Sequence, residues 1–190
     1  IAAAFSSAML MATTNQLCLD VAVVPMLWLV PMGLYLLSYI LCFHSERCYT
    51  RTGYGAALAI ALGQTCWILS RGIYVNLPLQ ILSYSFTLFV CCMVCHGELV
   101  RLKPAPRHLT LFYLMISAGG ALGGVFVSLT APRIFQGYWE FHLCLVGTGL
   151  FFMLILFLDR SGRLHAGRPR WAWSLLGLSM LVLIAALGTH

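Results

Sequence analysis

Apolar runs long enough to cross a lipid bilayer follow one another along this sequence and constrain its fold more than any other feature. Pro25 and Pro31 are expected to kink the first of them, because proline removes a backbone donor. Each run has roughly 18 to 23 residues, enough for an α-helix to cross a hydrocarbon core of about 30 Å. Backbone groups in lipid must be paired internally, and these runs lack the alternation of a barrel strand, so we expect a helical bundle. The predicted spans are 21–43, 53–70, 77–95, 109–131, 141–158 and 171–188.

The composition supports the same class. Hydrophobic residues make up 61% of the chain, charged residues only 8%, and the mean hydropathy is +0.92, whereas soluble domains carry about 25% charged residues. The sequence therefore predicts an all-α integral membrane protein, with a six-helix transmembrane domain over 21–190. Residues 1–20 are too mixed for a span, and we expect the end of a preceding helix and an outer loop there. Because the sequence starts without methionine and stops directly after an apolar run, we expect a fragment of a longer chain.

Basic residues are distributed unevenly between the connections. The second and fourth connections hold only Arg71 and Arg133. The positive-inside rule therefore predicts that the odd-numbered connections face the cytoplasm, and it accounts for the formal net charge of +6 without a nucleic-acid partner. The basic residues of the first, third and fifth connections are Arg47, Arg51, Arg101, Lys103, Arg107, Arg160, Arg163, Arg168 and Arg170.

Cys92, Cys95 and His96 fit the C-x-x-C-H pattern by which c-type haem is attached. The predicted topology places this motif on the cytoplasmic side, whereas haem is attached to such motifs in bacteria on the opposite side. We therefore reject covalent haem and interpret these cysteines as small apolar side chains of a membrane helix. No cofactor and no metal site are expected in this fragment.

Acidic and basic side chains gather in the connection between the third and fourth spans. Gly97 is expected to end the third helix in a left-handed conformation, and Pro104 and Pro106 to stiffen the return. Such a cluster could bind an anion or couple protons, or it could be a solvated loop whose ion pairs contribute about 0 to 1 kcal/mol each. The residues of this candidate functional loop are His96, Glu98, Arg101, Arg107 and His108.

Four glycines in the fourth span form overlapping small-x-x-x-small pairs, Gly119 with Gly123 and Gly120 with Gly124. Glycines at this spacing let another helix backbone approach closely, so they are candidates for helix packing. A phosphate-binding glycine loop would need a preceding strand, which the sequence does not predict.

Asp20 and Arg71 form a candidate polar site on the outer side, although Arg71 also fits a simple interfacial anchor. Glu140 is expected to face the same side. The predicted spans contain no carboxylate or lysine near their centres, which weakens a transport interpretation. No catalytic residue is expected in this fragment, so whether the parent chain is an enzyme stays open.

Two stretches carry a family resemblance: "ATTNQLCLDVAVVPMLWLVPMGLYLLSYILCF" (12–43) and "CHGELVRLKPAPRHLTLFYLMISAGGALGGVFVSLTAP" (95–132). They resemble the membrane region of bacterial fused transporter/spermidine synthase-like proteins. The resemblance implies a multi-pass region of the bacterial inner membrane, joined in the parent protein to a cytoplasmic aminopropyltransferase-like domain that is not in this chain. It carries over only family-like positions of unknown role, which are His96, Gly97, Glu98, Leu99, Pro104, Pro106 and the glycine pairs.

Two functions remain open. The first is the membrane-embedded region of a spermidine synthase-like fusion protein, acting as an anchor or a transport module. The alternative is a structural or accessory subunit packed into a larger membrane protein complex. Both imply the lipid bilayer and other membrane helices or subunits as partners.

Overall fold

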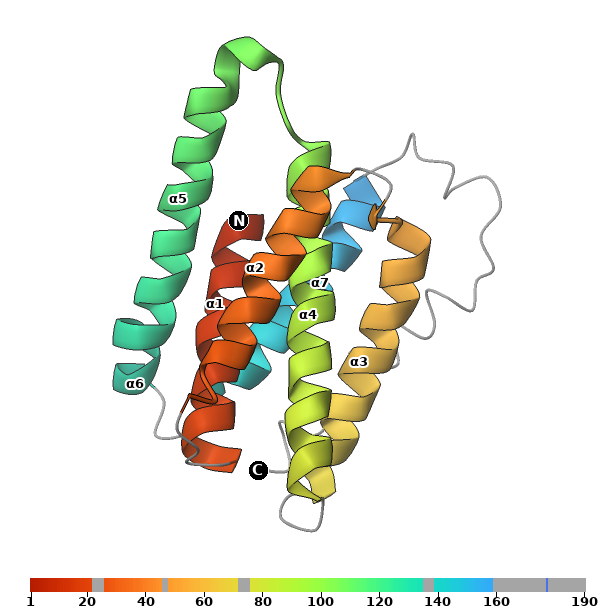
Figure 1. The fold of residues 1–190 in the computed structure, drawn as a ribbon, viewed down its shortest axis with the longest axis vertical. Coiled ribbons are helices and arrows are strands. Elements are labelled where there is room, and N and C mark those ends of the chain that lie inside the picture. Colours follow the sequence, from red (N-terminus) through yellow and green to blue (C-terminus); the bar gives the residue numbers. More distant parts are fainter. Residues whose placement is uncertain (22–25, 46–47, 72–75, 135–138, 159–176, 178–190) are drawn as a thin grey trace.

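The computed structural model describes residues 1–21, 26–45, 48–71, 76–134, 139–158 and 177, and within these ranges all regular secondary structure is helical (Figure 1). The prediction of an all-helical chain is therefore confirmed for this part of the protein. The predicted sixth span, 171–188, lies outside the described residues except for Gly177.

Among the residues that the structure describes, four helical segments are long and apolar enough to cross a membrane. They correspond to the second to fifth predicted spans, and the main difference is that α4 continues six residues beyond the predicted end at Cys95. The fourth predicted span is one continuous helical stretch in which a π-helical turn, Phe126–Thr130, joins α5 to α6. The segments are α3 (Arg51–Arg71), α4 (Leu77–Arg101), α5 (Leu109–Val125) with α6 (Ala131–Ile134), and α7 (Trp139–Leu158).

The N-terminal part of the chain differs from its prediction. Residues 1–20 were expected to hold the end of a helix followed by an outer loop, but the backbone is helical from Ala2 onwards: α1 (Ala2–Asn15) continues as a π-helical turn, Gln16–Val21. Alanine, leucine and methionine, all strong helix formers, supply much of α1, so its helical propensity is high although its polarity is too mixed for a membrane span.

The first predicted span is shorter than expected. Its helix, α2, covers only Leu29–His44 and falls below the length of the four spanning segments. Pro31 lies in the first turn of α2, where a backbone N–H has no partner within the helix, so it sits at the start of the helix and does not kink its middle. Pro25 lies outside the described residues.

The core is built around α4, which packs against α1, α2, α3 and α7. Its side chains are buried almost without interruption from Ser83 to Val100. Helix α1 lies between α5 on one side and the remaining helices on the other, and α5 packs chiefly on α1 (Figure 1). The end of α2, the end of α4 and the start of α5 lie at the same end of the bundle, near the top of Figure 1. We call this the basic end.

Candidate functional site

Helix α4 does not end at Gly97 as predicted but continues to Arg101. At this position the Tyr49 ring lies against the backbone of Gly97. A Cβ atom at position 97 would overlap the Tyr49 ring. Glycine therefore serves here as a close-contact residue inside a helix and not as a helix terminator.

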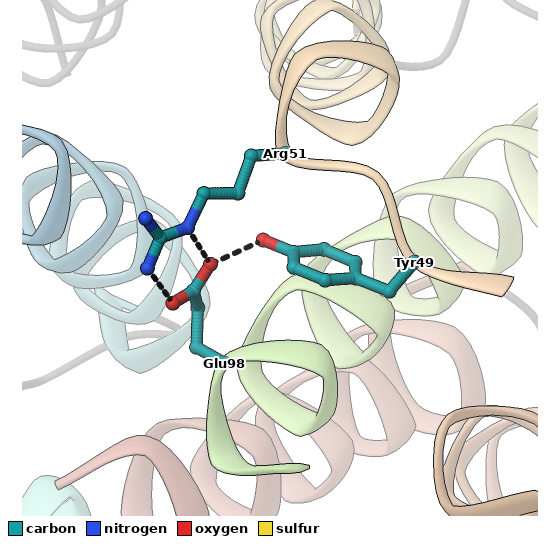
Figure 2. Close-up of polar contacts among 3 residues, drawn as sticks. All are labelled: Tyr49, Arg51 and Glu98. Carbon is teal, nitrogen blue, oxygen red and sulfur yellow. Dashed lines mark hydrogen bonds and ion pairs between the residues drawn. The ribbon is translucent and has the colours of Figure 1, made fainter. Parts of the chain in front are cut away.

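Because α4 continues, Glu98 lies in the helix and is buried, and its carboxylate is bound by two residues from the segment that precedes and begins α3 (Figure 2). Arg51 donates from Nε to Oε1 and from Nη2 to Oε2, and both distances are 2.6 Å. The hydroxyl of Tyr49 donates to Oε1 over 2.8 Å. The side chains of Arg51 and Glu98 are only 11% and 3% exposed, so this is a buried, bidentate ion pair.

The electrostatics of this site follow from its burial. A buried carboxylate is costly unless it is paired and hydrogen-bonded, and here the guanidinium and the phenol supply three donors. Burial, and then the neighbouring Glu98 carboxylate, raise the pKa of Tyr49. The Tyr49 hydroxyl therefore keeps its proton and acts as a donor at neutral pH.

The predicted functional loop is split by the structure. Arg101 lies in the last turn of α4, and Arg107 and His108 lie in the short 3-10 helix before α5. All three side chains are exposed, whereas His96 and Glu98 are buried. The cation that binds Glu98 is Arg51, which comes from a different connection and was absent from the predicted loop. A usable signal was present, because the charge asymmetry already assigned Arg51 to the same side as this loop.

His96 points away from the ion pair and towards α2, as expected for residues two apart in a helix. It is 1% exposed, and its Nδ1 lies 3.0 Å from the Ser38 hydroxyl oxygen. The rings of Tyr35 and Tyr39 meet the imidazole edge to face at 5.0 and 5.3 Å. The imidazole is thus fixed between α2 and α4 as an interhelical contact.

No protein-family model, curated protein or solved structure matches this chain. The resemblance to synthase-like fusion proteins therefore stays a prediction from the sequence.

The cysteines of the C-x-x-C-H pattern lie inside α4. Cys92 and Cys95 are both fully buried, in the stretch of α4 that packs against its neighbouring helices. Within the described part of the chain, no group of three or more histidine, cysteine, aspartate or glutamate side chains is arranged to hold a metal ion.

The two glycine pairs of α5 have different surroundings. A Cβ atom on Gly123 would overlap the carbonyl oxygen of Ala4, and one on Gly119 would lie 3.3 Å from the Ala3 Cβ atom. A Cβ atom on Gly120 would meet nothing within 4 Å, and one on Gly124 would only reach Ser7 Oγ at 4.0 Å. Gly119 and Gly123 therefore form the close contact with α1.

The candidate outer site, Asp20 with Arg71, stays a prediction, because only one of its two side chains is described. Arg71 is exposed, and its guanidinium carbon lies 5.6 Å from the centroid of the Trp67 ring, as in a cation–π contact. The side chain of Asp20 lies outside the described part. Glu140, near the start of α7, is buried and accepts a hydrogen bond of 3.5 Å from the Asn15 amide.

Proposed function

We propose that this chain is the membrane-embedded region of a spermidine synthase-like fusion protein in the bacterial inner membrane, and that it serves as an anchor. The fusion-protein part of the proposal rests on the sequence resemblance of 12–43 and 95–132. The observation that carries the membrane anchor is the arrangement of polar groups in a bundle of long apolar helices. The buried charges of Arg51 and Glu98 satisfy each other, while large apolar side chains cover the outside of α5 and α7. This is the pattern that a lipid environment requires.

Contacts between α3 and α4 support the anchor over the transport module. The Gln64 amide of α3 donates to the Ser83 carbonyl oxygen of α4 over 3.4 Å. The hydroxyl oxygens of Thr65 and Thr87 lie 2.8 Å apart. Polar groups of this kind hold membrane helices together.

Two measurements on the natural gene product test this function. Alkaline carbonate extraction should leave the protein in the membrane pellet, and its release would contradict the membrane assignment. Intact mass with peptide mapping beyond His190 should give a mass well above 21.0 kDa and the peptides of a soluble, acidic, glycine-rich domain. A mass near 21.0 kDa would remove the fusion-protein assignment.

The alternative, a structural or accessory subunit of a larger membrane complex, is favoured by one observation. Helix α5 packs chiefly on α1, and much of its remaining surface is exposed and apolar, including Leu114, Met115 and Leu122. In a complex, another subunit would cover this surface. Co-purification of a stoichiometric partner that shields α5 from labelling in the membrane would favour this alternative over the anchor.

A further inference from the structure

A strip of exposed basic side chains follows the connection from α4 to α5. Arg101, Lys103 and Arg107 are exposed, and none of them forms an ion pair with another described residue. His108 and, at the end of α2, His44 are also exposed. The elements that carry these residues meet at the basic end of the bundle (Figure 1).

The nearest acidic residue in the sequence does not neutralise this strip. Glu98 precedes Arg101 by three positions, which on an exposed helix would allow an ion pair. Its carboxylate is instead buried and bound by Arg51 and Tyr49. The positive charges of Arg101, Lys103 and Arg107 are therefore left for a partner outside the described chain.

The sequence adds an argument from charge balance. Under the predicted topology, the connections at the basic end hold all the basic residues except Arg71 and Arg133, against three acidic residues, Glu46, Glu98 and Asp159. The opposite end holds Asp20 and Glu140 against its two arginines, so its formal charge is zero. The whole formal charge of +6 therefore belongs to one end.

We infer that the strip formed by Arg101, Lys103 and Arg107 is a binding surface for the headgroups of anionic phospholipids. The inference rests on the membrane placement proposed above, because the strip then lies where apolar helices meet the headgroup region. Leu102 is 70% exposed between two of these cations, which gives the strip an apolar side chain for the acyl boundary as well as charge for the phosphate. Pro104 and Pro106 restrict the backbone that carries it.

The test measures lipid selectivity of the purified protein in reconstituted bilayers, with spin-labelled phosphatidylglycerol and phosphatidylcholine as probes. The wild type should associate preferentially with phosphatidylglycerol, and high salt should weaken the preference because exposed charges are screened. The R101Q/K103Q/R107Q variant should lose on the order of 10- to 100-fold in relative affinity. The matched control R71Q/R133Q, which removes exposed arginines from the opposite end, should keep the wild-type preference.

The inference would be overturned by equal association of both lipids with the wild type, by an unchanged preference in the triple variant, or by an equal loss in the control. Binding of polyglutamate at the strip without phosphatidylglycerol selectivity would point to an acidic protein instead and would also overturn it. Helical circular dichroism of each variant excludes misfolding as the cause of a loss. Carbonate extraction distinguishes failure of the lipid-binding strip from failure of the membrane assignment. A protein that stays in the membrane pellet but shows no lipid selectivity contradicts only the lipid-binding strip.

Discussion

Arg51 and Glu98 lie 47 residues apart in the sequence, yet their charged groups meet edge to edge through two hydrogen bonds of 2.6 Å. Arg51 is the first residue of α3, and Glu98 lies in the last turns of α4. The pair therefore fixes the start of one helix against the end of the next, at the end of the bundle opposite their short connection. The stability of the fold should depend on this contact.

Replacing Arg51 by glutamine should destabilise the fold strongly. The substitution leaves the Glu98 carboxylate buried without a cation, and breaking a buried pair in this way costs about 3 to 5 kcal/mol. Thermal or denaturant unfolding of the detergent-solubilised protein, followed by helical circular dichroism, measures the loss. Arg51→Lys should also be destabilising, because lysine cannot make the bidentate contact.

The double variant R51Q/E98Q is the matched control. It removes both charges at nearly constant volume, so its loss should be clearly smaller than that of Arg51→Gln alone. Losses in the double variant as large as in the single one would mean that the charge pairing is not what holds Arg51 and Glu98 together.

Replacing Gly97 by alanine should displace the Tyr49 ring from α4. The added methyl group has no room beside the ring, and overpacking of this kind costs about 1 to 3 kcal/mol. Gly120→Ala is the control, since it faces open space in a helix and should be neutral or stabilising by up to about 1 kcal/mol. Equal stability of the two variants would contradict the close contact of Gly97 with Tyr49.

At alkaline pH, the wild type and Tyr49→Phe should differ in how steeply their unfolding free energy depends on pH. Since burial raises the pKa of Tyr49, the folded state holds the phenol proton more tightly than the unfolded state does. The protonated phenol therefore contributes to the stability of the fold. This contribution to stability is complete below the ordinary tyrosine pKa of about 10 and is lost as the pH rises above it. Unfolding free energies measured across this range should fall more steeply with pH for the wild type, and parallel profiles would refute the assignment.

Gly123→Leu should break the contact between α5 and α1, because the side chain would collide with the backbone of Ala4. Gly120→Leu should leave the isolated protein as stable as the wild type, since a Cβ atom at this position would meet nothing within 4 Å. Protease protection of α5 in detergent measures the first effect. If Gly120→Leu disturbs assembly only in the native membrane, position 120 contacts another subunit, as the accessory-subunit alternative requires.

The predicted topology is open to a direct test. Alkaline phosphatase and fluorescent protein fused at Pro104 and at Arg133 should report the cytoplasm and the outer side, respectively. The reverse result would overturn the side assignment and would reopen the haem interpretation, which a haem stain of the denatured chain then decides.

The sequence predicted the helical class and four of the long helices because apolar runs report directly on burial in lipid or in a core. It was less informative wherever tertiary contacts decide. The second half of residues 1–20 is polar enough to resemble a loop, yet the helix continues through it to Val21 and α1 packs between α5 and α4. Gly97 carries a terminator signal, but the close contact with Tyr49 explains a glycine within the helix.

The candidate site was predicted only in part, because its contacts also depend on tertiary packing. Glu98 was singled out, but a linear cluster cannot show that its cation is Arg51, from another connection. Glu140 lies at a predicted span end, and nothing about that position in the sequence indicated that packing against α1 buries it. Contacts that form only when the helices pack cannot be predicted from the spacing of residues within one segment.

The position of α1 between α5 and α4 also affects biogenesis. Synthesis proceeds from the N-terminus, so α1 emerges from the ribosome well before the helix that covers its Ala3 and Ala4 face. Until Gly119 and Gly123 arrive, that face has to be shielded by lipid, by the insertion machinery or by a partner. The docking of α5 is then a late step in assembling this bundle, and a defect at Gly123 would appear as failed maturation of a newly made chain.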